Sequence, residues 1–294
     1  MRIFDCTTYF NEPLIMDVRF NILNEHVTKF IIVESAYSHS GAKKKINFDK
    51  NLYPQFKDKI EHIIVEKEPE NILDTDNADI DINKRTNSIL RISLQRNEAL
   101  KACKEASEED YIFYSDNDEI PNLSGLDLEK INEKIIIFEQ KLFYYKFNLH
   151  LDRIYWYGTR AVNKKNLTTF QQLREIKPKK YSFYRLDTLF KKNKFIDLKI
   201  VKNGGWHFTR ILSPQDIHSR ELETEHSDEY LKANKNSKKI KDLISRKVID
   251  HDHLVDKKEY KFSREFKLKT LSINQLPIYI QDNVVKYSNY LDLE

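Results

Sequence analysis

The sequence predicts an α/β protein with a central, mostly parallel sheet flanked by helices. Short runs of β-branched and aromatic residues recur along residues 1–121, and segments with apolar residues at helical spacing separate them. Strands that alternate with helices form right-handed βαβ units, so their strands run parallel. Several of the predicted strands end in acidic or polar residues, at the edge where such sheets bind ligands.

Four strands are expected in this first part, each a compact apolar run that ends in polar residues. They cover residues 3–10, 29–35, 60–66 and 110–115. A helix over residues 13–24 begins at Pro13, because proline suits the first helical turn. A second helix is expected over residues 85–106, after a polar surface loop at residues 67–84.

The rest of the chain has a different pattern. Residues 134–148 form a dense strand-like run, and the aromatic stretch 153–160 follows it. The chain then becomes rich in Lys, Asp and Glu, and helices are expected over residues 213–246 and 277–291.

Composition excludes several classes of protein. The 294 residues are 40% hydrophobic, enough for a well-buried core. The 50 Lys and Arg nearly balance the 46 Asp and Glu, and the signs are mixed along the chain, so we expect no nucleic-acid partner. We see neither a signal peptide nor a run of roughly 18 apolar residues, and therefore expect no transmembrane segment and a cytoplasmic protein. Cys6 and Cys103 match no disulfide or metal pattern and are expected in the core.

Two aspartates follow the fourth predicted strand. Asp116 and Asp118 are two residues apart, a spacing that directs both side chains to one side of extended backbone. Two carboxylates aimed at one point repel each other unless a proton or a cation lies between them. A hard divalent cation accepts oxygen ligands and keeps positions free for phosphate oxygens. The alternative is a solvated turn, because Asp and Asn are favoured in turns.

Short polar and aromatic blocks follow one another along the chain. They are Phe10-Asn11-Glu12, Arg19, Asn24-Glu25, residues 27–35, Ser40-Gly41, Lys45, Gln95-Arg96-Asn97, residues 115–121, Trp156-Tyr157-Gly158, Leu173-Arg174, Gly205-Trp206-His207-Phe208 and His226. This series resembles glycosyltransferase family 17, the family of the β-1,4-mannosyl-glycoprotein 4-β-N-acetylglucosaminyltransferase. The resemblance covers nearly the whole chain and thins after His226.

The resemblance implies a GT-A-type nucleotide-diphospho-sugar transferase fold, a UDP-sugar donor, a divalent metal (Mn²⁺ or Mg²⁺) and inversion at the anomeric carbon. The named enzyme uses UDP-N-acetylglucosamine, and a glycan or another hydroxyl compound is the expected acceptor. The family's Asp-x-Asp motif falls on Asp116 and Asp118, with Asn117 between them. We expect one domain with three parts. These are a nucleotide-sugar-binding half at 1–121, an acceptor-side half at 122–230 and a helical C-terminal extension at 231–294.

Further residues are candidates for the same site. The resemblance makes His207 a third metal ligand or a diphosphate contact, and a hydrogen-bonded loop histidine is the alternative. Arg96 carries a guanidinium fork that suits phosphate oxygens, and the alternative is an ordinary ion pair with a neighbouring residue. Glu34, at a strand end, is a candidate for binding the base or ribose of the nucleotide. The alternative is that Glu34 is simply a solvated residue at the end of its strand. Trp206 and Trp156 each offer a flat face for a sugar ring, against core packing.

An inverting transfer needs a carboxylate that takes the proton of the acceptor hydroxyl. The sequence does not single this residue out among the acidic residues of the acceptor-side half. The weak candidates are Asp152, Asp197, Glu221, Glu223 and Glu225.

Two other functions remain open. A nucleotidyltransferase shares the parallel sheet and the acidic metal site, but it normally carries a Gly-rich basic loop after its first strand. Residues 7–11 contain neither glycine nor lysine, which argues against it. A carbohydrate-binding protein that kept the fold and lost turnover is disfavoured by the presence of Asp116, Asp118 and His207.

Overall fold

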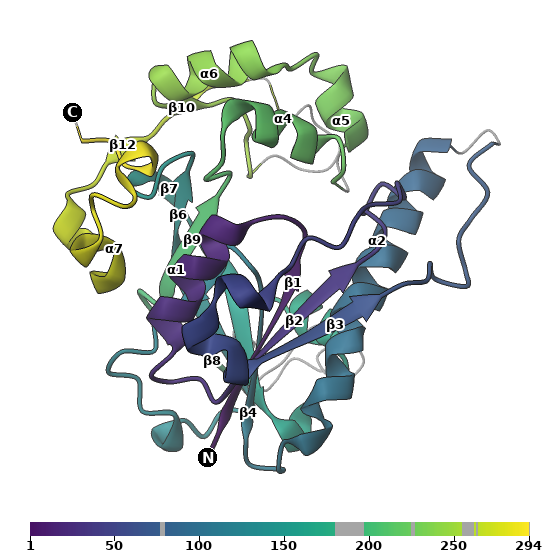
Figure 1. Cartoon of the computed structure of the whole chain (residues 1–294), viewed down its shortest axis with the longest axis vertical. Helices are drawn as coiled ribbons and strands as arrows, with labels where there is room; N and C mark the ends of the chain where they lie inside the picture. The colour runs from purple at the N-terminus through teal and green to yellow at the C-terminus, as the bar shows by residue number, and fades with distance from the viewer. Residues whose placement is uncertain (77–79, 180–196, 225–226, 255–261, 263, 294) are drawn as a thin grey trace.

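The computed structural model describes residues 1–76, 80–179, 197–224, 227–254, 262 and 264–293 (Figure 1). Within these ranges, ten strands form one sheet in the order β3-β2-β1-β4-β7-β6-β9-β5, with β8 paired to β6 and β12 paired to β7. Helices lie against both faces of the sheet (Figure 1). The predicted α/β class, with a central and largely parallel sheet flanked by helices, is confirmed.

The first half of the sheet is parallel throughout. It consists of β1 (Ile3–Tyr9), β2 (Lys29–Ser35), β3 (Ile60–Val65) and β4 (Tyr111–Asp116). β1 lies between β2 and β4, and β2 pairs with β3. These four strands lie within one residue of their expected bounds. β1, β2 and β4 are apolar runs buried on both faces, whereas the edge strand β3 is partly exposed.

Two layers of helix cover this half. α1 (Pro13–Leu23) packs on one face, against Phe30 and Ile32, while Ile31 and Val33 point to the other face. There they meet η3 (Ala99–Glu105), which continues α2 (Ile80–Glu98). α2 begins inside the stretch expected to be a loop. Cys6 and Cys103 are both buried in this second layer, with their Sγ atoms 3.7 Å apart.

The second half of the sheet is mixed. Its main strands are β5 (Glu119–Pro121), β6 (Ile135–Tyr144), β7 (Leu149–Asn163), β8 (Leu198–Val201), β9 (Gly205–Thr209) and β12 (Lys269–Thr270). β7 runs antiparallel to β4 and β6, β9 runs parallel to β6, and β5 runs antiparallel to β9. β6 and β7 are joined by a few residues, a connection short enough only for an antiparallel pair. Tyr145 turns the chain there with a positive φ of 65°.

Three helices lie above the carboxyl ends of β1 and β2 (Figure 1). They are α4 (Pro214–Glu221), α5 (Ser227–Lys232) and α6 (Ser237–Ser245), which we call the helical cap. α4 and α6 pack on β6 through a separate apolar cluster that includes Ile217, Ile240 and Leu142. Residues 213–246 therefore contain helices, as expected.

The end of the chain returns to the first half. α7 (Ile278–Asp282) is much shorter than the helix expected over residues 277–291. Tyr287 donates its hydroxyl to Asp17 of α1 at 2.5 Å, which fixes this segment beside that helix. The two-stranded pair of β10 (Val248–Ile249) and β11 (Phe266–Lys267) and the short helix α3 (Phe170–Glu175) complete the main elements.

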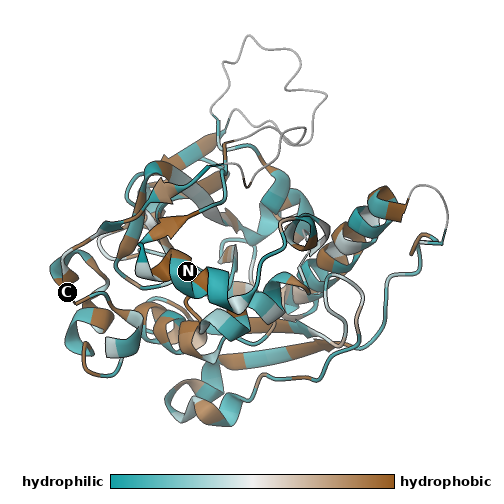
Figure 2. Ribbon diagram, turned by 90° about the horizontal axis from the view of Figure 1, so that it is seen from above, coloured by the Kyte–Doolittle hydropathy of each residue, from teal (hydrophilic) through white to brown (hydrophobic). Residues whose placement is uncertain are grey.

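Hydrophobic and hydrophilic residues alternate along both the strands and the helices (Figure 2). In the described part of the chain, no helix combines the length and the apolar character needed to cross a bilayer.

Candidate active site

A cavity of ≈ 280 Å³ opens at the carboxyl ends of β1 and β4. Its walls come from the end of β1 and the β1–α1 turn, the loop after β2, the C-terminal part of α2, the β4–β5 turn, β7, β9 and α4. This is the edge at which open α/β sheets bind ligands. A larger hollow of ≈ 510 Å³ lies at the other end of β4, around Tyr111. It lacks the aspartate pair, so the cavity at the carboxyl ends is the candidate site.

The β4–β5 turn carries Asn117 and Asp118 into the cavity and is held from below by a buried arginine. Arg19 of α1 is fully buried and donates to the carbonyl oxygens of Asn117 (3.3 Å) and Glu119 (2.9 Å). The charge of Arg19 is balanced by Asp5, whose Oδ1 lies 2.6 Å from Nη2. The turn is therefore fixed by the folded core before any ligand binds.

Asp116 lies between two arginines. Its Oδ2 is 3.0 Å from Nη2 of Arg174, and its Oδ1 is 3.3 Å from Nη2 of Arg96. Burial would raise the pKa of Asp116, but the charges of Arg174 and Arg96 outweigh it and hold the pKa well below its ordinary value. Asp116 is thus ionised, and its carboxylate is already paired.

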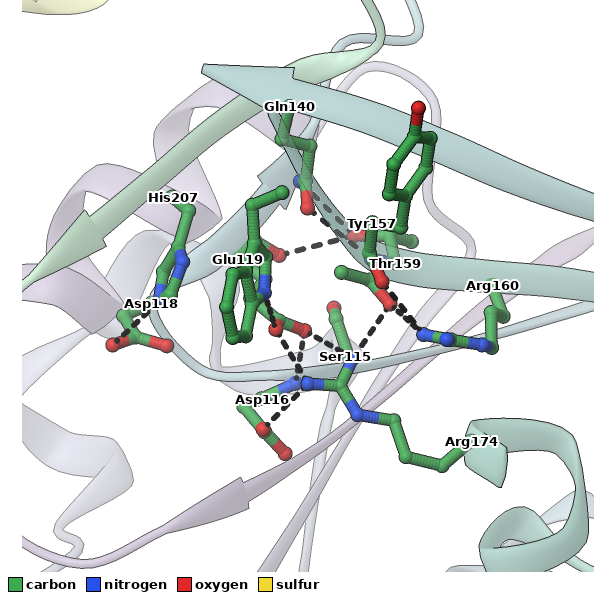
Figure 3. A network of polar contacts seen from close by, with 12 residues as sticks. Ser115, Asp116, Asp118, Glu119, Gln140, Tyr157, Thr159, Arg160, Arg174 and His207 are labelled. Carbon is green, nitrogen blue, oxygen red and sulfur yellow. Dashed lines mark hydrogen bonds and ion pairs between the residues drawn. The ribbon is translucent and has the colours of Figure 1, made fainter. Parts of the chain in front are cut away.

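Asp118 faces a histidine from the other half of the sheet. The register of β5 and β9 places His207 opposite Glu119, so that Nε2 of His207 lies 3.4 Å from Oδ2 of Asp118 (Figure 3). Burial opposes charge on both groups, but their attraction raises the pKa of His207 and, with Arg220, lowers the pKa of Asp118. The pair is stable as carboxylate and imidazolium, or as carboxylate and neutral imidazole around a cation.

Glu119 connects the turn to the second half of the sheet. Its buried carboxylate accepts from Nε1 of Trp156 (2.5 Å), from both terminal nitrogens of Arg174 (2.6 and 2.8 Å) and from the backbone N–H of Asp116 (3.0 Å). Figure 3 shows Arg174 between Asp116 and Glu119. Gly158 is required beside them, because a Cβ there would lie 2.6 Å from Cδ of Glu119. Glu119 therefore orients Arg174 and Trp156.

Glu12 connects the turn to the helical cap. Its Oε2 accepts from Nδ2 of Asn117 at 2.5 Å and from the backbone N–H groups of Phe10 and Asn11. Its Oε1 lies 2.5 Å from Nη1 of Arg220 in α4. Asn117 thus lines the cavity with its side chain committed to Glu12.

The predicted metal ligands meet at this cavity but differ in what surrounds them. Asp118 and His207 offer one oxygen and one nitrogen 3.4 Å apart, and Nδ1 of His207 is buried without a hydrogen-bond partner among the described residues. Asp116 is engaged by two arginines. The described residues include no cluster of three or more His, Cys, Asp or Glu side chains arranged to hold a metal. The donor set fits a Mn²⁺ or Mg²⁺ that takes its other ligands from phosphate and water.

Two other predicted binding residues lie away from the cavity wall. Glu34 is fully buried and accepts from Lys44 (2.6 Å) and from the backbone N–H groups of Asn47 (2.8 Å) and Phe48 (2.9 Å). It therefore shapes the loop after β2. Trp206 packs against the main apolar cluster, whereas Trp156 lines the cavity.

The weak candidates for the base are dispersed. Asp152 is exposed on β7, Asp197 precedes β8, and Glu221 is paired with Arg210 at 2.8 Å. The backbone carbonyl of Glu223 accepts from the N–H of Ser40. None of these four lines the cavity. Glu225 lies outside the described residues, as does His226.

Sequence reasoning missed several residues that line the cavity. Glu12 and Glu119 stand inside the blocks that carry the resemblance, but nothing local shows what they contact. His39 lines the cavity too, and burial with the charge of Arg96 lowers its pKa to about 4, so that it is neutral near pH 7. Arg220 belongs to a charged helix with no distinguishing pattern.

Comparison with known proteins adds the family. A family model described as glycosyltransferase family 17 matches residues 1–179, more than half of the chain. The chain belongs to glycosyltransferase family 17. It is therefore a glycosyltransferase, as the resemblance predicted. The residues matched to family 17 include Asp116, Asp118 and Arg174, while His207 and Arg220 come after the match.

Solved structures resemble this family 17 chain only distantly. HddC from Yersinia pseudotuberculosis is 15% identical, with a TM-score of 0.31, over 69% of this chain and 91% of its own. The inositol-1-phosphate CTP transferase from T. maritima is 12% identical, with a TM-score of 0.31, over 70% and 86%. A putative glucose-1-phosphate thymidylyltransferase from Bacillus anthracis is 10% identical, with a TM-score of 0.34, over 70% and 88%. Similarity at this level of identity and TM-score does not indicate the activity of this chain. No curated protein sequence gives a significant match.

Proposed function

We propose that this family 17 glycosyltransferase is metal-dependent and inverting, and that it moves a sugar from a UDP-sugar to a hydroxyl acceptor such as a glycan. The observation that carries the proposal is the pairing of Asp118 with His207 on the wall of the cavity, at 3.4 Å. One carboxylate and one imidazole leave most positions of a divalent cation to the oxygens of a diphosphate.

Different residues around the cavity would have different roles in such a transfer. Asp118 and His207 would hold Mn²⁺ or Mg²⁺, which supplies charge neutralisation to the departing diphosphate. Asp116 keeps Arg96 and Arg174 in place, and of these two arginines Arg96 lines the cavity. Trp156, fixed by Glu119, presents an aromatic face to a sugar ring.

The transfer itself is one displacement. The acceptor oxygen forms a bond to the anomeric carbon from the face opposite the nucleotide. The bond from that carbon to the phosphate oxygen breaks, and the electron pair leaves with UDP. The proton of the acceptor hydroxyl passes to a carboxylate at the cavity.

The first test is a thermal-shift screen of the full chain with UDP-, GDP- and dTDP-sugars, each with Mn²⁺ and with EDTA. Ligand binding to the native state raises the melting temperature, because it stabilises that state by an amount that grows with the logarithm of the ratio of ligand concentration to Kd. We expect the largest shift with a UDP-sugar and Mn²⁺. Equal shifts with Mn²⁺ and EDTA would contradict metal dependence. Binding of a UDP-sugar with no release of UDP on incubation with Mn²⁺ would favour an inactive binding protein.

A further inference from the structure

The helical cap contributes one cation to the cavity. Arg220 lies in the last turn of α4 and lines the same cavity as Asp116 and Asp118. α4 follows the residues matched to the family model, so the family comparison does not reach Arg220.

Arg220 differs from the other arginines near the site in how firmly it is held. Arg174 contacts Asp116, Glu119 and the carbonyl of Gly158, and Arg96 contacts Tyr114, Gln171 and Asp116. In the described part of the chain, Arg220 has a single acidic partner, Glu12. The side chain of Arg220 is 29% exposed, against 15% for Arg96 and 13% for Arg174.

The neighbouring acid does not compete for Arg220. Glu221 is paired with Arg210, whose Nε lies 2.8 Å from its Oε1. The contact with Glu12 runs through one terminal nitrogen, Nη1, and a guanidinium has five N–H donors in a planar fork. Arg220 can therefore keep Glu12 and still offer N–H groups to an anion in the cavity.

An anionic ligand in this cavity needs a positively charged group that is not already fully paired. The carboxylates of Glu12, Asp116, Asp118 and Glu119 line the cavity, and each already faces a cation of the protein. The UDP that leaves carries more negative charge than the bound UDP-sugar, and one divalent cation offsets only part of it. A partly exposed arginine with a single ion pair is suited to the rest.

We infer that Arg220 binds the diphosphate of the nucleotide from the helical cap. The inference rests on the proposed function, since it requires a nucleoside diphosphate in this cavity. It adds a donor-binding residue from a part of the chain beyond the family match.

The test compares UDP with uridine, because the two ligands differ only in the diphosphate. Wild-type protein and the variant Arg220→Gln are titrated with each ligand at fixed Mn²⁺, with binding followed by calorimetry. We expect Arg220→Gln to weaken UDP binding about 10- to 100-fold, as for loss of one charge-assisted contact, and to change uridine binding less than about twofold. Arg220→Lys keeps the charge without the fork and should give a smaller loss with the same selectivity.

The control for the loss of one positive charge is Arg246→Gln. Arg246 is exposed and pairs with Asp242 and Glu265 rather than with a residue of the cavity, so UDP and uridine should both bind as in wild type. Equal losses for UDP and uridine in Arg220→Gln, or no loss for either, would overturn the inference. If Arg220→Gln does not fold, an unselective effect of Arg220→Lys overturns it instead.

Glu12→Gln separates phosphate binding from a purely structural ion pair. If Arg220 acts only through the ion pair that holds α4 to Glu12, breaking this pair in Glu12→Gln should reproduce the loss seen in Arg220→Gln. If Arg220 binds the diphosphate, Glu12→Gln releases the guanidinium and UDP binding is retained or strengthened. Failure of wild-type protein to bind UDP with Mn²⁺ would overturn the proposed function together with this inference, whereas wild-type binding with an unaltered Arg220→Gln overturns the inference alone.

Discussion

The two halves of the sheet differ both in how their strands run and in what they bring to the cavity. The first half is parallel throughout and, together with the connection from β4 to the start of β5, supplies the acids Glu12, Asp116, Asp118 and Glu119. The second half of the sheet contains both parallel and antiparallel strand pairs. This half, the helix α3 and the helical cap supply the partners of these acids. The partners are Trp156, Arg174, His207 and Arg220.

The difference shows how the site depends on the whole fold. Each of these four acids is paired with a group that lies between 37 and 208 residues away in the sequence. The shortest separation joins Glu119 to Trp156, and the longest joins Glu12 to Arg220. Arg96 of α2 is the exception, since it comes from the first half and contacts Asp116. Changes to the acids and to their partners should therefore have matching effects on activity.

The largest expected effect is on turnover. Asp118→Asn and His207→Gln should each lower transfer from a UDP-sugar by at least about 100-fold, because each removes one side of the proposed cation site. Steady-state rates at several Mn²⁺ concentrations measure this. His26→Gln, an exposed histidine after α1, is the matched control and should retain wild-type rates. If either Asp118→Asn or His207→Gln kept full activity, the proposal that both residues hold the cation would be contradicted.

A large loss of stability is expected at Arg174. Arg174→Met leaves the buried Glu119 and the paired Asp116 without their shared cation, which should lower the free energy of unfolding by about 3–5 kcal/mol. Urea unfolding of the full chain measures it. Arg246→Met, at an exposed ion pair, should unfold as wild type does. An unfolding free energy of Arg174→Met close to wild type would show that Glu119 is not stabilised across the two halves.

A moderate effect should separate the two tryptophans. Trp156→Phe keeps an aromatic ring but loses the N–H that Glu119 accepts, and should raise KM for the donor sugar about 2- to 10-fold. Trp206→Phe changes a side chain in the apolar cluster and should affect stability while leaving KM unchanged. Initial rates and urea unfolding of both variants check this, and the reverse pattern would restore Trp206 as the sugar-binding residue.

The smallest effect concerns an acid of the first half that lies outside the cavity. Burial would raise the pKa of Asp110, but the N–H groups of Arg2 and Ser107 outweigh it and keep the pKa below its ordinary value. The folded state therefore holds the proton less tightly than the unfolded state. The resulting stabilisation is complete above the unfolded pKa of about 3.9 and is lost as the pH falls further.

Asp110→Asn should accordingly lose stability near pH 7 and show a weaker decline below about pH 4 than wild type. Urea unfolding at a series of pH values measures the two curves. Asp58→Asn, at an exposed aspartate, serves as the control. Parallel curves for wild type and Asp110→Asn would show that Asp110 does not contribute to the acid sensitivity.

The sequence predicted the first half of the sheet closely and the second half poorly, for a physical reason. β2 at Lys29–Ser35 was bounded correctly because a strand buried on both faces is one continuous apolar run. The strands of the second half have mixed neighbours and irregular lengths, and nothing local in them shows a parallel or antiparallel partner. The expected helix over residues 277–291 is replaced by a short one that is fixed by a tertiary contact with Asp17.

The residues of the candidate site also differ in how well the sequence predicts them. Asp116 and Asp118 were visible in the sequence because two acids at a strand end form a local pattern. The role of Glu119 was not visible, because its partners Trp156 and Arg174 lie 37 and 55 residues away. Glu34 shows the reverse case, since a strand-end acid that appeared available is occupied by the loop that follows it.

The central claim is that Asp118 and His207 hold a cation shared with the nucleotide's diphosphate. Calorimetric titration of the protein with Mn²⁺, in the presence and absence of UDP, tests it most directly. The account predicts that UDP tightens Mn²⁺ binding and that Mn²⁺ tightens UDP binding by the same factor, as linkage requires, and that both effects disappear in Asp118→Asn. UDP binding of equal affinity with Mn²⁺ and with EDTA would contradict the account.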